Sequence, residues 1–545
     1  MVPLDMGTTG PTFLARNEDA KGYAPGSVER AALQAEIDAQ VDTRVEIPLV
    51  IDGRRVSTSA QMPLAAPHDH NLVLATLSQA RAEDTRQAIA AACRAHEEWS
   101  RWSLHERAAV FLKAADLLAG PWRQRLNAAT MLGQSKTVQQ AEIDSACELI
   151  DFLRFNVQFA QEAAAQHPRS SPGVRNWTDH RPLEGFVYAV TPFNFTAIGG
   201  NLPTAPALMG NTVLWKPATT AALSNFLFLD LLEEAGLPPG VINFLPGDAA
   251  SVSSAVLADR NFAGLHFTGS TEVFDQLWAR AAQNLAGYRS YPRLVGETGG
   301  KDFVLGHRSA DVEMLAVALA RGAFEYQGQK CSAASRAYVP ASLWPELRER
   351  LVAMVSGIRV GDVRDFSNFM GAVIDRKAFD RIKGYIDGAH TDRGCQILIG
   401  GEADASRGYF INPTVIEVEE PSHTLMEHEI FGPVLAVYVY EDRRWSDVLR
   451  LVDETSPYAL TGAVFAQDRR ALAEAAAALR FAAGNFYIND KPTGAVVGQQ
   501  PFGGSRRSGT NDKAGSFLNL LRWTSPRTLK ETHVAARDYR YPHMQ

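Results

Sequence analysis

The chain has 545 residues, more than one ordinary domain holds, so two or three domains are expected. Hydrophobic residues make up 46% and charged residues 21%, which is typical of a soluble globular protein, and the net charge of −7 argues against a nucleic-acid surface. The four cysteines form no CxxC pair, so neither a zinc site nor a redox dithiol is indicated and no metal is expected.

The first 40 residues show no targeting pattern. No lysine or arginine precedes Arg16, so the basic start of a secretory signal is missing. Several acidic residues before Gln40 argue against a mitochondrial transit peptide. Together with four unpaired cysteines, these observations lead to the expectation of a cytoplasmic protein.

The chain up to about residue 180 is predicted to be mostly helical. Helices are expected at 84–118, 122–133 and 138–166. The segment 176–185 shows a break before the next strand, so it is expected to leave the main body as part of a hairpin. The polar tail after Thr528 is expected to pack on a partner subunit.

An uncharged stretch follows, from Gly185 to Trp215. Its three prolines and its glycines are incompatible with a spanning helix, so it is interpreted as a buried wall and no membrane association is expected.

From residue 186 onward, short apolar runs alternate with helical patterns, which predicts βαβ units around a mostly parallel sheet. The succession is typical of a doubly wound dinucleotide-binding domain. Strands are expected at 185–190, 211–218, 241–247 and 263–269, with helices at 222–235, 251–259 and 270–285.

A second α/β region is predicted from about Gly299 onward, with the same alternation and therefore a second open sheet. Its helices are expected at 311–327, 342–357, 445–453 and 469–479, and its strands at 334–339, 432–440 and 459–466.

Cys331 is a candidate nucleophile. Small residues follow it in GQKCSA (328–333), which leaves the sulfur accessible, and the adjacent Lys330 is expected to favour the thiolate. A buried structural cysteine is the alternative, and this motif alone does not exclude it.

Glu297 is a candidate base because it ends an apolar run. Gly296, Gly299 and Gly300 surround it and allow another group to approach the backbone closely. The alternative is a solvated carboxylate in a turn.

Asn194 lies between two phenylalanines in the uncharged wall, where a buried amide needs partners. Its NH2 group either donates to a developing oxyanion or ties a turn.

Taken together, these motifs and their order resemble the aldehyde dehydrogenase superfamily, in which the catalytic Glu and Cys have the same separation of 34 positions. The resemblance begins at about residue 45. The motifs that carry it are PFNF (192–195), LWKPA (214–218), FTGSTEV (267–273), ETGGKD (297–302), GQKCSA (328–333), EIFGPV (429–434) and PFGG (501–504).

The resemblance implies an α/β fold with three parts. Residues 1–173 and 186–299 would form a Rossmann-like NAD(P)-binding domain, and 300–514 a second, catalytic α/β domain. Residues 174–185 and 515–545 would form a small β arm for oligomerisation, so a homodimer or larger homo-oligomer is expected.

The resemblance also implies the roles of individual residues. Cys331 would be the nucleophile and Glu297 the general base, and Asn194 with the Cys331 backbone N–H would form the oxyanion hole. Anions are favoured at a helix N-terminus, where Ser270 would meet the cofactor pyrophosphate. The residues implied in cofactor binding are Lys216, Ser270, Gly269, Glu429, Phe431, Pro192 and Phe193.

Two departures from the family pattern concern the cofactor. Phe274 stands where the family often has a second glycine, so a slightly different position of the cofactor's tail is expected. Thr219 replaces a Glu that often selects against a 2′-phosphate. NAD is still the expected cofactor, but the loss of this Glu leaves the use of NADP open.

Substrate choice should depend on loops beyond the shared motifs. Residues 489–516, 322–340, 141–156 and 23–34 resemble the family members that oxidise L-glutamate γ-semialdehyde, the open form of pyrroline-5-carboxylate, to L-glutamate in proline catabolism. The alternative is another ω-semialdehyde, such as succinate semialdehyde.

For that substrate, the backbone amides of Gly494 and Ala495 with the Ser332 hydroxyl are interpreted as a carboxylate clamp. Phe195 and Phe502 would form an apolar sleeve. Glu148 would meet the ammonium group, with a solvated helix carboxylate as the alternative, and a plain turn is the alternative for Gly494 and Ala495.

The length leaves no room for a fused proline dehydrogenase, so any such partner is expected to be a separate, transient one.

Overall fold

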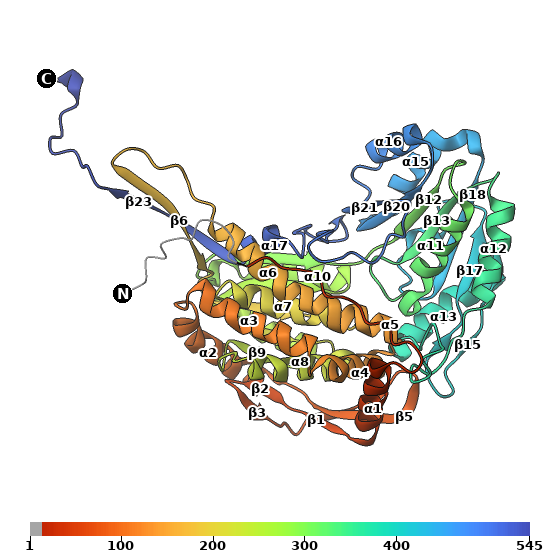
Figure 1. Cartoon of the computed structure of the whole chain (residues 1–545), viewed down its shortest axis with the longest axis horizontal. Coiled ribbons are helices and arrows are strands. Elements are labelled where there is room, and N and C mark those ends of the chain that lie inside the picture. The colour runs from red at the N-terminus through yellow and green to blue at the C-terminus, as the bar shows by residue number, and fades with distance from the viewer. Residues whose placement is uncertain (1–12, 545) are drawn as a thin grey trace.

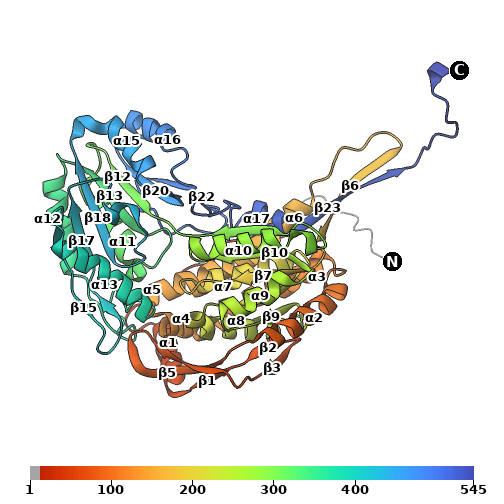
Figure 2. The same cartoon turned by 180° about the vertical axis from the view of Figure 1, so that it is seen from behind.

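The computed structural model describes residues 13–544, and in it the chain forms two lobes with a two-stranded arm projecting from one of them (Figures 1 and 2). Each lobe contains a seven-stranded sheet covered by helices on both faces. This is the α/β architecture predicted from the alternation of strands and helices.

The sheet of the first lobe has the strand order β11-β10-β7-β8-β9-β2-β3. The five strands from β11 to β9 are parallel, β2 is antiparallel to β9, and β3 is antiparallel to β2. The strands are β2 (Leu49–Ile51), β3 (Arg54–Val56), β7 (Phe186–Val190), β8 (Thr212–Lys216), β9 (Ile242–Phe244), β10 (Phe262–Thr268) and β11 (Arg293–Glu297).

Alternating side chains of this sheet enter two separate cores. Phe186 and Tyr188 pack with one set of helices, whereas Val187 and Ala189 pack with the other, as the two-residue period of a strand requires. The first set is α2 (Ala82–Trp99), α9 (Ala249–Ala258) and α10 (Thr271–Gln283). The second set is α3 (Leu104–Ala119), α4 (Arg123–Gln134), α6 (Leu149–Ala164), α7 (Thr196–Leu208) and α8 (Ala222–Glu234).

The strands and helices predicted between residues 185 and 285 are confirmed, with boundaries that differ by only a few residues. The helices predicted earlier in the chain need correction. The helix expected at 84–118 is two helices, because Ser103 caps the second one and Glu106 completes its capping box. The helix expected at 138–166 contains a π-helix, η1 (Glu142–Glu148), between α5 (Val138–Ala141) and α6.

The expectation of a mostly helical start was wrong for residues 45–78. This region holds β1 (Val45–Ile47), β2, β3, β4 (Gln61–Ala66) and β5 (Asp69–Ser78). Three of these strands have only three residues, too few to show a two-residue alternation in the sequence.

The sheet of the second lobe has the order β14-β17-β18-β13-β12-β20-β21, and only β14 is antiparallel to its neighbour. The strands are β12 (Asp302–Gly306), β13 (Ala334–Pro340), β14 (Cys395–Ile399), β17 (Thr414–Val418), β18 (Val434–Tyr440), β20 (Thr461–Phe465) and β21 (Asn485–Ile488). Helices α11 (Val312–Phe324) and α12 (Trp344–Ser356) cover one face. Helices α13 (Arg376–Thr391), α15 (Trp445–Glu454) and α16 (Arg469–Ala478) cover the other.

One helix of this lobe is shorter than predicted. The helix expected at 311–327 ends at Phe324, and residues 325–328 form a turn in which Tyr326 and Gln327 have left-handed backbone angles, with φ of 50° and 55°. This turn leads directly to Cys331.

The arm consists of β6 (Val174–Pro182) and β23 (Thr524–Thr532), which pair antiparallel along nine residues each (Figure 1). Residues 176–182 therefore do leave the main body, but they pair with the C-terminal segment rather than with a neighbouring one. The C-terminal strand of the arm begins at Thr524, later than the predicted residue 515, because the residues just before it pack on the first lobe. Helix α17 (Phe517–Arg522) packs on α6, and the Trp523 carbonyl accepts a hydrogen bond of 2.9 Å from the Asn211 amide inside the first lobe.

Within residues 13–544, no helix combines the length and the apolar character that crossing a membrane requires.

Candidate active site

The carboxyl ends of four parallel strands meet at one edge of the first sheet. Val190, the last residue of β7, pairs with Lys216 on one side and with Phe267 on the other, and Thr268 pairs with Glu297. Strand order changes direction between β7 and β10, and such a switch point is where open α/β sheets bind their ligands. The predicted residues that follow these strands therefore lie at a single edge: Pro192, Phe193, Asn194, Phe195, Lys216, Gly269, Ser270 and Glu297.

The glycines after Glu297 allow the two lobes to approach closely, as predicted. A Cβ atom on Gly299 would lie 2.6 Å from the Glu429 carboxylate, and one on Gly300 would overlap the Cys331 carbonyl oxygen. The Gly300 N–H donates to Glu429 at 2.8 Å. Glu297, Cys331 and Glu429 are distant in the sequence. They lie close together because Gly299 and Gly300 have no side chain.

Asn194 is attached to the turn that precedes Cys331. Its Nδ2 atom donates to the Gln329 carbonyl at 3.1 Å, and the Gln329 side chain in turn accepts from the Ile374 N–H at 2.9 Å. The amide is buried, so this bond fixes its position. One of its two amide hydrogens is used in this bond, which leaves the second for another acceptor.

The electrostatic environment of Cys331 differs from the prediction. Lys330 was expected to favour the thiolate, but its ammonium group lies 3.1 Å from Glu325. Burial, together with the carboxyl groups of Glu297, Asp302 and Glu429, raises the pKa of the Cys331 thiol well above its usual range. The expectation about Lys330 was therefore wrong, and the thiol needs a proton acceptor in order to react.

A cavity of about 330 Å³ lies against Cys331. Besides Cys331, it is lined by seven other residues predicted for the site, which are Glu297, Ser332, Phe195, Phe502, Gly494, Ala495 and Glu148. Candidate groups for chemistry and for recognition of a substrate thus share one enclosed space.

Two carboxyl groups of this cavity have strongly shifted pKa values. Burial raises the pKa of Glu297 to about 8, against the opposing effect of Lys513. Burial, with the nearby Asp144 carboxylate, raises the pKa of Glu148 to about 8 as well. A carboxyl group with a pKa near neutrality can both take up and release a proton, which is the property required of a general base.

The segment expected to hold a carboxylate, which we call the clamp loop (residues 493–500), begins beside Ser332. The Ser332 hydroxyl donates to the Thr493 hydroxyl at 2.9 Å, and Lys491 donates to the Thr493 carbonyl at 3.2 Å. Gly494 has a φ of +96°, a backbone conformation that L side chains rarely adopt. The turn therefore needs glycine for its own geometry, whatever it binds.

Several residues implied in cofactor binding lie around the switch point and between the lobes. Ser270 caps α10, and its hydroxyl accepts from the Val273 N–H at 3.4 Å. Burial lowers the pKa of Lys216 to about 8, and its ammonium group donates to the Pro217 carbonyl at 3.2 Å. The rings of Phe193 and Phe431 meet edge to face, with centroids 5.9 Å apart.

Phe274, the departure from the family pattern, belongs to the first turn of α10, and its ring is directed into the core. Its ring stacks on Phe267 at a centroid distance of 5.4 Å and covers Gly296, where a Cβ atom would overlap it. The side chain thus fills space beside β11. Thr219, the other departure, lies three residues after Lys216 and begins a short 3-10 helix (Thr219–Ala221).

Several residues that line the cavity were not predicted from the sequence. Lys491, Thr493, Asp151 and Glu325 lie within stretches selected by resemblance (489–516, 141–156 and 322–340), so their position was an available signal. Asn17 and Glu18 had no such signal, because they come from a segment outside those stretches.

A family model described as "Aldehyde dehydrogenase family" matches residues 55–528. The chain belongs to the aldehyde dehydrogenase family. Within that family it is similar to delta-1-pyrroline-5-carboxylate dehydrogenases. The protein with that name from Dictyostelium discoideum is 53% identical over 531 residues, covering 97% of this chain and 95% of that protein. The one from Bos taurus is 51% identical over 530 residues, covering 97% and 94%.

The solved structures agree with this similarity. The Delta-pyrroline-5-carboxylate dehydrogenase from Mycobacterium tuberculosis, bound with NAD, superposes with a TM-score of 0.95 at 54% identity, covering 99% of this chain and 100% of that one. The aldehyde dehydrogenase fold predicted from the sequence motifs is thereby confirmed.

The expectation of a cytoplasmic protein is contradicted. The relatives from Dictyostelium discoideum, Bos taurus and Homo sapiens are all named as mitochondrial proteins. That expectation was based on the first 40 residues and on the four unpaired cysteines.

Proposed function

We propose that this protein oxidises L-glutamate γ-semialdehyde, the open form of Δ1-pyrroline-5-carboxylate, to L-glutamate with NAD, as a step of proline catabolism. The observation that carries the proposal is the content of one cavity. Cys331 and Glu297 line it together with Ser332, Gly494 and Glu148. The first two supply chemistry for an aldehyde, and the others suit the charged groups of an α-amino acid.

The residues around the switch point fit a dinucleotide. The N-terminus of α10 at Gly269 and Ser270 offers backbone N–H groups to a pyrophosphate, and Lys216 offers a buried ammonium group to a ribose. Glu429 suits the other ribose, and Phe193 and Phe431 suit the nicotinamide ring. When bound there, NAD supplies the acceptor for the hydride that leaves the substrate carbon.

In the first half of the proposed reaction, a water molecule accepts the proton of Cys331 and the thiolate attacks the aldehyde carbon, which converts the carbonyl oxygen into an oxyanion. The second amide hydrogen of Asn194 and the Cys331 backbone N–H donate to this oxyanion. One such donor typically contributes roughly 3–4 kcal/mol. Loss of a hydride then leaves a thioester on Cys331.

In the second half, Glu297 takes a proton from water, and the resulting hydroxide attacks the thioester carbon. The carbon–sulfur bond breaks, the Cys331 sulfur takes the proton held by Glu297, and L-glutamate leaves. A well-placed general base contributes about 10²–10⁴-fold to such a step. The raised pKa of Glu297, about 8, supports this role because the carboxylate is a stronger base than an ordinary one.

The proposed substrate lies with its carboxylate at the amides of Gly494 and Ala495 and at the Ser332 hydroxyl. Phe195 and Phe502 enclose its methylene groups. Glu148 meets the ammonium group, where a positive charge would offset the cost of burying a carboxylate.

The domain roles follow from this assignment. The first lobe binds NAD, the second carries the nucleophile, and the β6–β23 arm joins copies of the chain into a homodimer or larger assembly. The similarity to proline utilization A from Bdellovibrio bacteriovorus supports a role in the use of proline. This chain superposes on 53% of that protein with a TM-score of 0.89 at 29% identity. A separate proline dehydrogenase is the transient partner we propose.

Steady-state kinetics with two aldehydes tests the substrate. We expect kcat/KM for pyrroline-5-carboxylate to exceed that for succinate semialdehyde by roughly 100-fold or more, because only the former has an ammonium group for Glu148. Production of NADH is measured at equal enzyme concentration with each substrate. Equal values for the two compounds would contradict the assignment and favour a general ω-semialdehyde dehydrogenase.

A further inference from the structure

The first described residues of the chain form an extended segment, which we call the N-terminal strap (residues 13–23). It runs beside α6 and η1, visible as the dark red tube in Figure 1. Its backbone N–H groups donate to side chains of those helices instead of to another strand. Ala15 donates to Gln158 at 2.8 Å, Glu18 to Asp151 at 2.7 Å and Lys21 to Glu142 at 2.7 Å.

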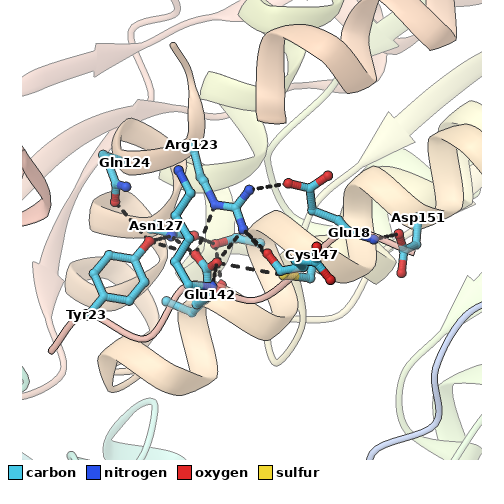
Figure 3. A network of polar contacts seen from close by, with 12 residues as sticks. Glu18, Tyr23, Arg123, Gln124, Asn127, Glu142, Cys147 and Asp151 are labelled. Carbon is cyan, nitrogen blue, oxygen red and sulfur yellow. Dashed lines mark hydrogen bonds and ion pairs between the residues drawn. The ribbon is translucent and has the colours of Figure 1, made fainter. Parts of the chain in front are cut away.

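Buried charges hold the strap in place. The Glu18 carboxylate lies between Arg123 at 2.6 Å and Arg154 at 2.8 Å, and Arg123 also pairs with the buried Glu142 (Figure 3). Although burial acts in the opposite direction, these two arginines hold the pKa of Glu18 below its usual value. The Tyr23 hydroxyl completes the network by donating to Glu142 at 2.7 Å. None of these groups takes part in the proposed chemistry.

Asn17 is the point at which the strap reaches the clamp loop. Its Nδ2 atom donates to Asp151 at 2.7 Å and to the Val497 carbonyl at 2.8 Å. Its side-chain oxygen accepts from Gln499 at 3.0 Å. Asn17 also lines the cavity, together with Glu18 and Asp151. One amide side chain therefore connects α6 to a loop that lies 480 residues further along the chain.

Within the clamp loop, the Gln499 and Gln500 N–H groups donate to the Val496 carbonyl and Val497 is buried, and the Asn17 bonds add to these contacts. Gly494 and Gly498 both have positive φ angles, +96° and +82°, and glycine leaves the backbone the most freedom when nothing else holds it. Amides that recognise a carboxylate must keep a fixed direction, because a small misplacement weakens binding strongly.

We infer that Asn17 is a positioning residue for substrate specificity: by holding Val497 and Gln499, it keeps the Gly494 and Ala495 amides directed at the substrate carboxylate. This inference rests on the proposed function. It adds a determinant of specificity that lies outside the proposed catalytic and binding groups and comes from the opposite end of the chain.

The test compares Asn17→Ala and the nearly isosteric Asn17→Asp with Gln158→Ala as a matched control. Gln158→Ala removes a hydrogen bond between the strap and α6 but leaves the clamp loop untouched. Two quantities are measured in the full-length protein. The first is amide hydrogen exchange in a peptide covering residues 494–500. The second is KM and kcat with pyrroline-5-carboxylate and with propanal, which has no carboxylate.

We expect both Asn17 variants to exchange faster at residues 494–500 and to raise KM for pyrroline-5-carboxylate roughly tenfold, with kcat and the kinetics for propanal little changed. The control should match the wild type in both measurements. Unchanged exchange in the Asn17 variants would overturn the inference even if pyrroline-5-carboxylate proved not to be a substrate. Faster exchange with an unchanged KM, or an equal loss with propanal, would overturn the link to specificity while leaving the proposed function intact.

Discussion

The two ends of the cavity are assembled from different kinds of structure. At the Cys331 end, Asn194 follows β7, Glu297 ends β11 and Cys331 lies shortly before β13. At the far end, the lining comes from the π-helix η1, the clamp loop and the N-terminal strap. Reactive groups placed beside strands are held by two sheets, whereas groups on loops depend on a few side-chain contacts. Substitutions at the first end should therefore change kcat, and those at the far end should change KM.

The largest effect is expected for Cys331→Ala. Without the sulfur, no covalent intermediate forms, and we expect kcat to fall by about 10⁴-fold or more, while binding of NAD remains. Steady-state NADH production gives the rate, and a fluorescence titration with NAD gives the binding. A variant with substantial activity would remove Cys331 from the proposed mechanism. A variant that failed to bind NAD would show that the site had been disrupted as a whole.

The next largest effect is expected for Glu297→Gln. We expect a rapid burst of NADH followed by turnover that is roughly 10²–10⁴-fold slower, because the thioester forms but water is not activated. In the wild type, the Glu297 carboxyl is protonated below a pKa of about 8 and cannot accept a proton. Thioester hydrolysis should therefore fall as the pH drops below about 8, and this limb of the profile should be absent in the variant. Stopped-flow absorbance between pH 6 and 9 measures the burst of NADH and the pH dependence of the later turnover. A variant that keeps the same pH limb would contradict the assignment.

A smaller effect is expected for Glu148→Gln at the far end. The variant keeps the shape of the side chain but loses the charge that would face the ammonium group. We expect KM for pyrroline-5-carboxylate to rise roughly 10–100-fold with little change in kcat. KM for propanal should be unaffected, so propanal serves as the internal control. A fall in kcat for both aldehydes would place Glu148 among the groups that support chemistry and would break the contrast between the two ends.

The same contrast explains which parts of the site could be predicted from the sequence. Cys331, Glu297 and Asn194 occur in compact motifs, because the glycines and small residues that permit close contact are their immediate neighbours. The strands and helices after residue 185 were predictable because each is long enough to show its own period. The strap had no such signal. Asn17 and Glu18 act through Val497, Arg123 and Arg154, and nothing in the sequence near residue 17 indicates that those groups lie within reach.

The failed expectation about Lys330 has a related cause. Adjacency in the sequence suggested that its charge would act on Cys331, but residues 330–332 form a bend and a turn in which the Lys330 ammonium group is directed to Glu325. Glu325, five residues earlier, is its partner because the left-handed turn at Tyr326 and Gln327 folds the chain back. The direction of the Lys330 side chain, and therefore the group on which its charge acts, depends on this turn. The helical pattern of residues 311–327 gave no sign of it.

The π-helix η1 has a consequence for how this region tolerates change. Its wider turns accommodate more residues per turn than the α-helices on either side. Loss of one residue between Glu142 and Glu148 would therefore let ordinary α-helical winding replace the π-helix, with α5 and α6 kept close to their present directions. Loss of one residue from the middle of α6 would instead turn the two parts of that helix by about 100° relative to each other. A single-codon deletion should accordingly be tolerated better within η1 than within α6.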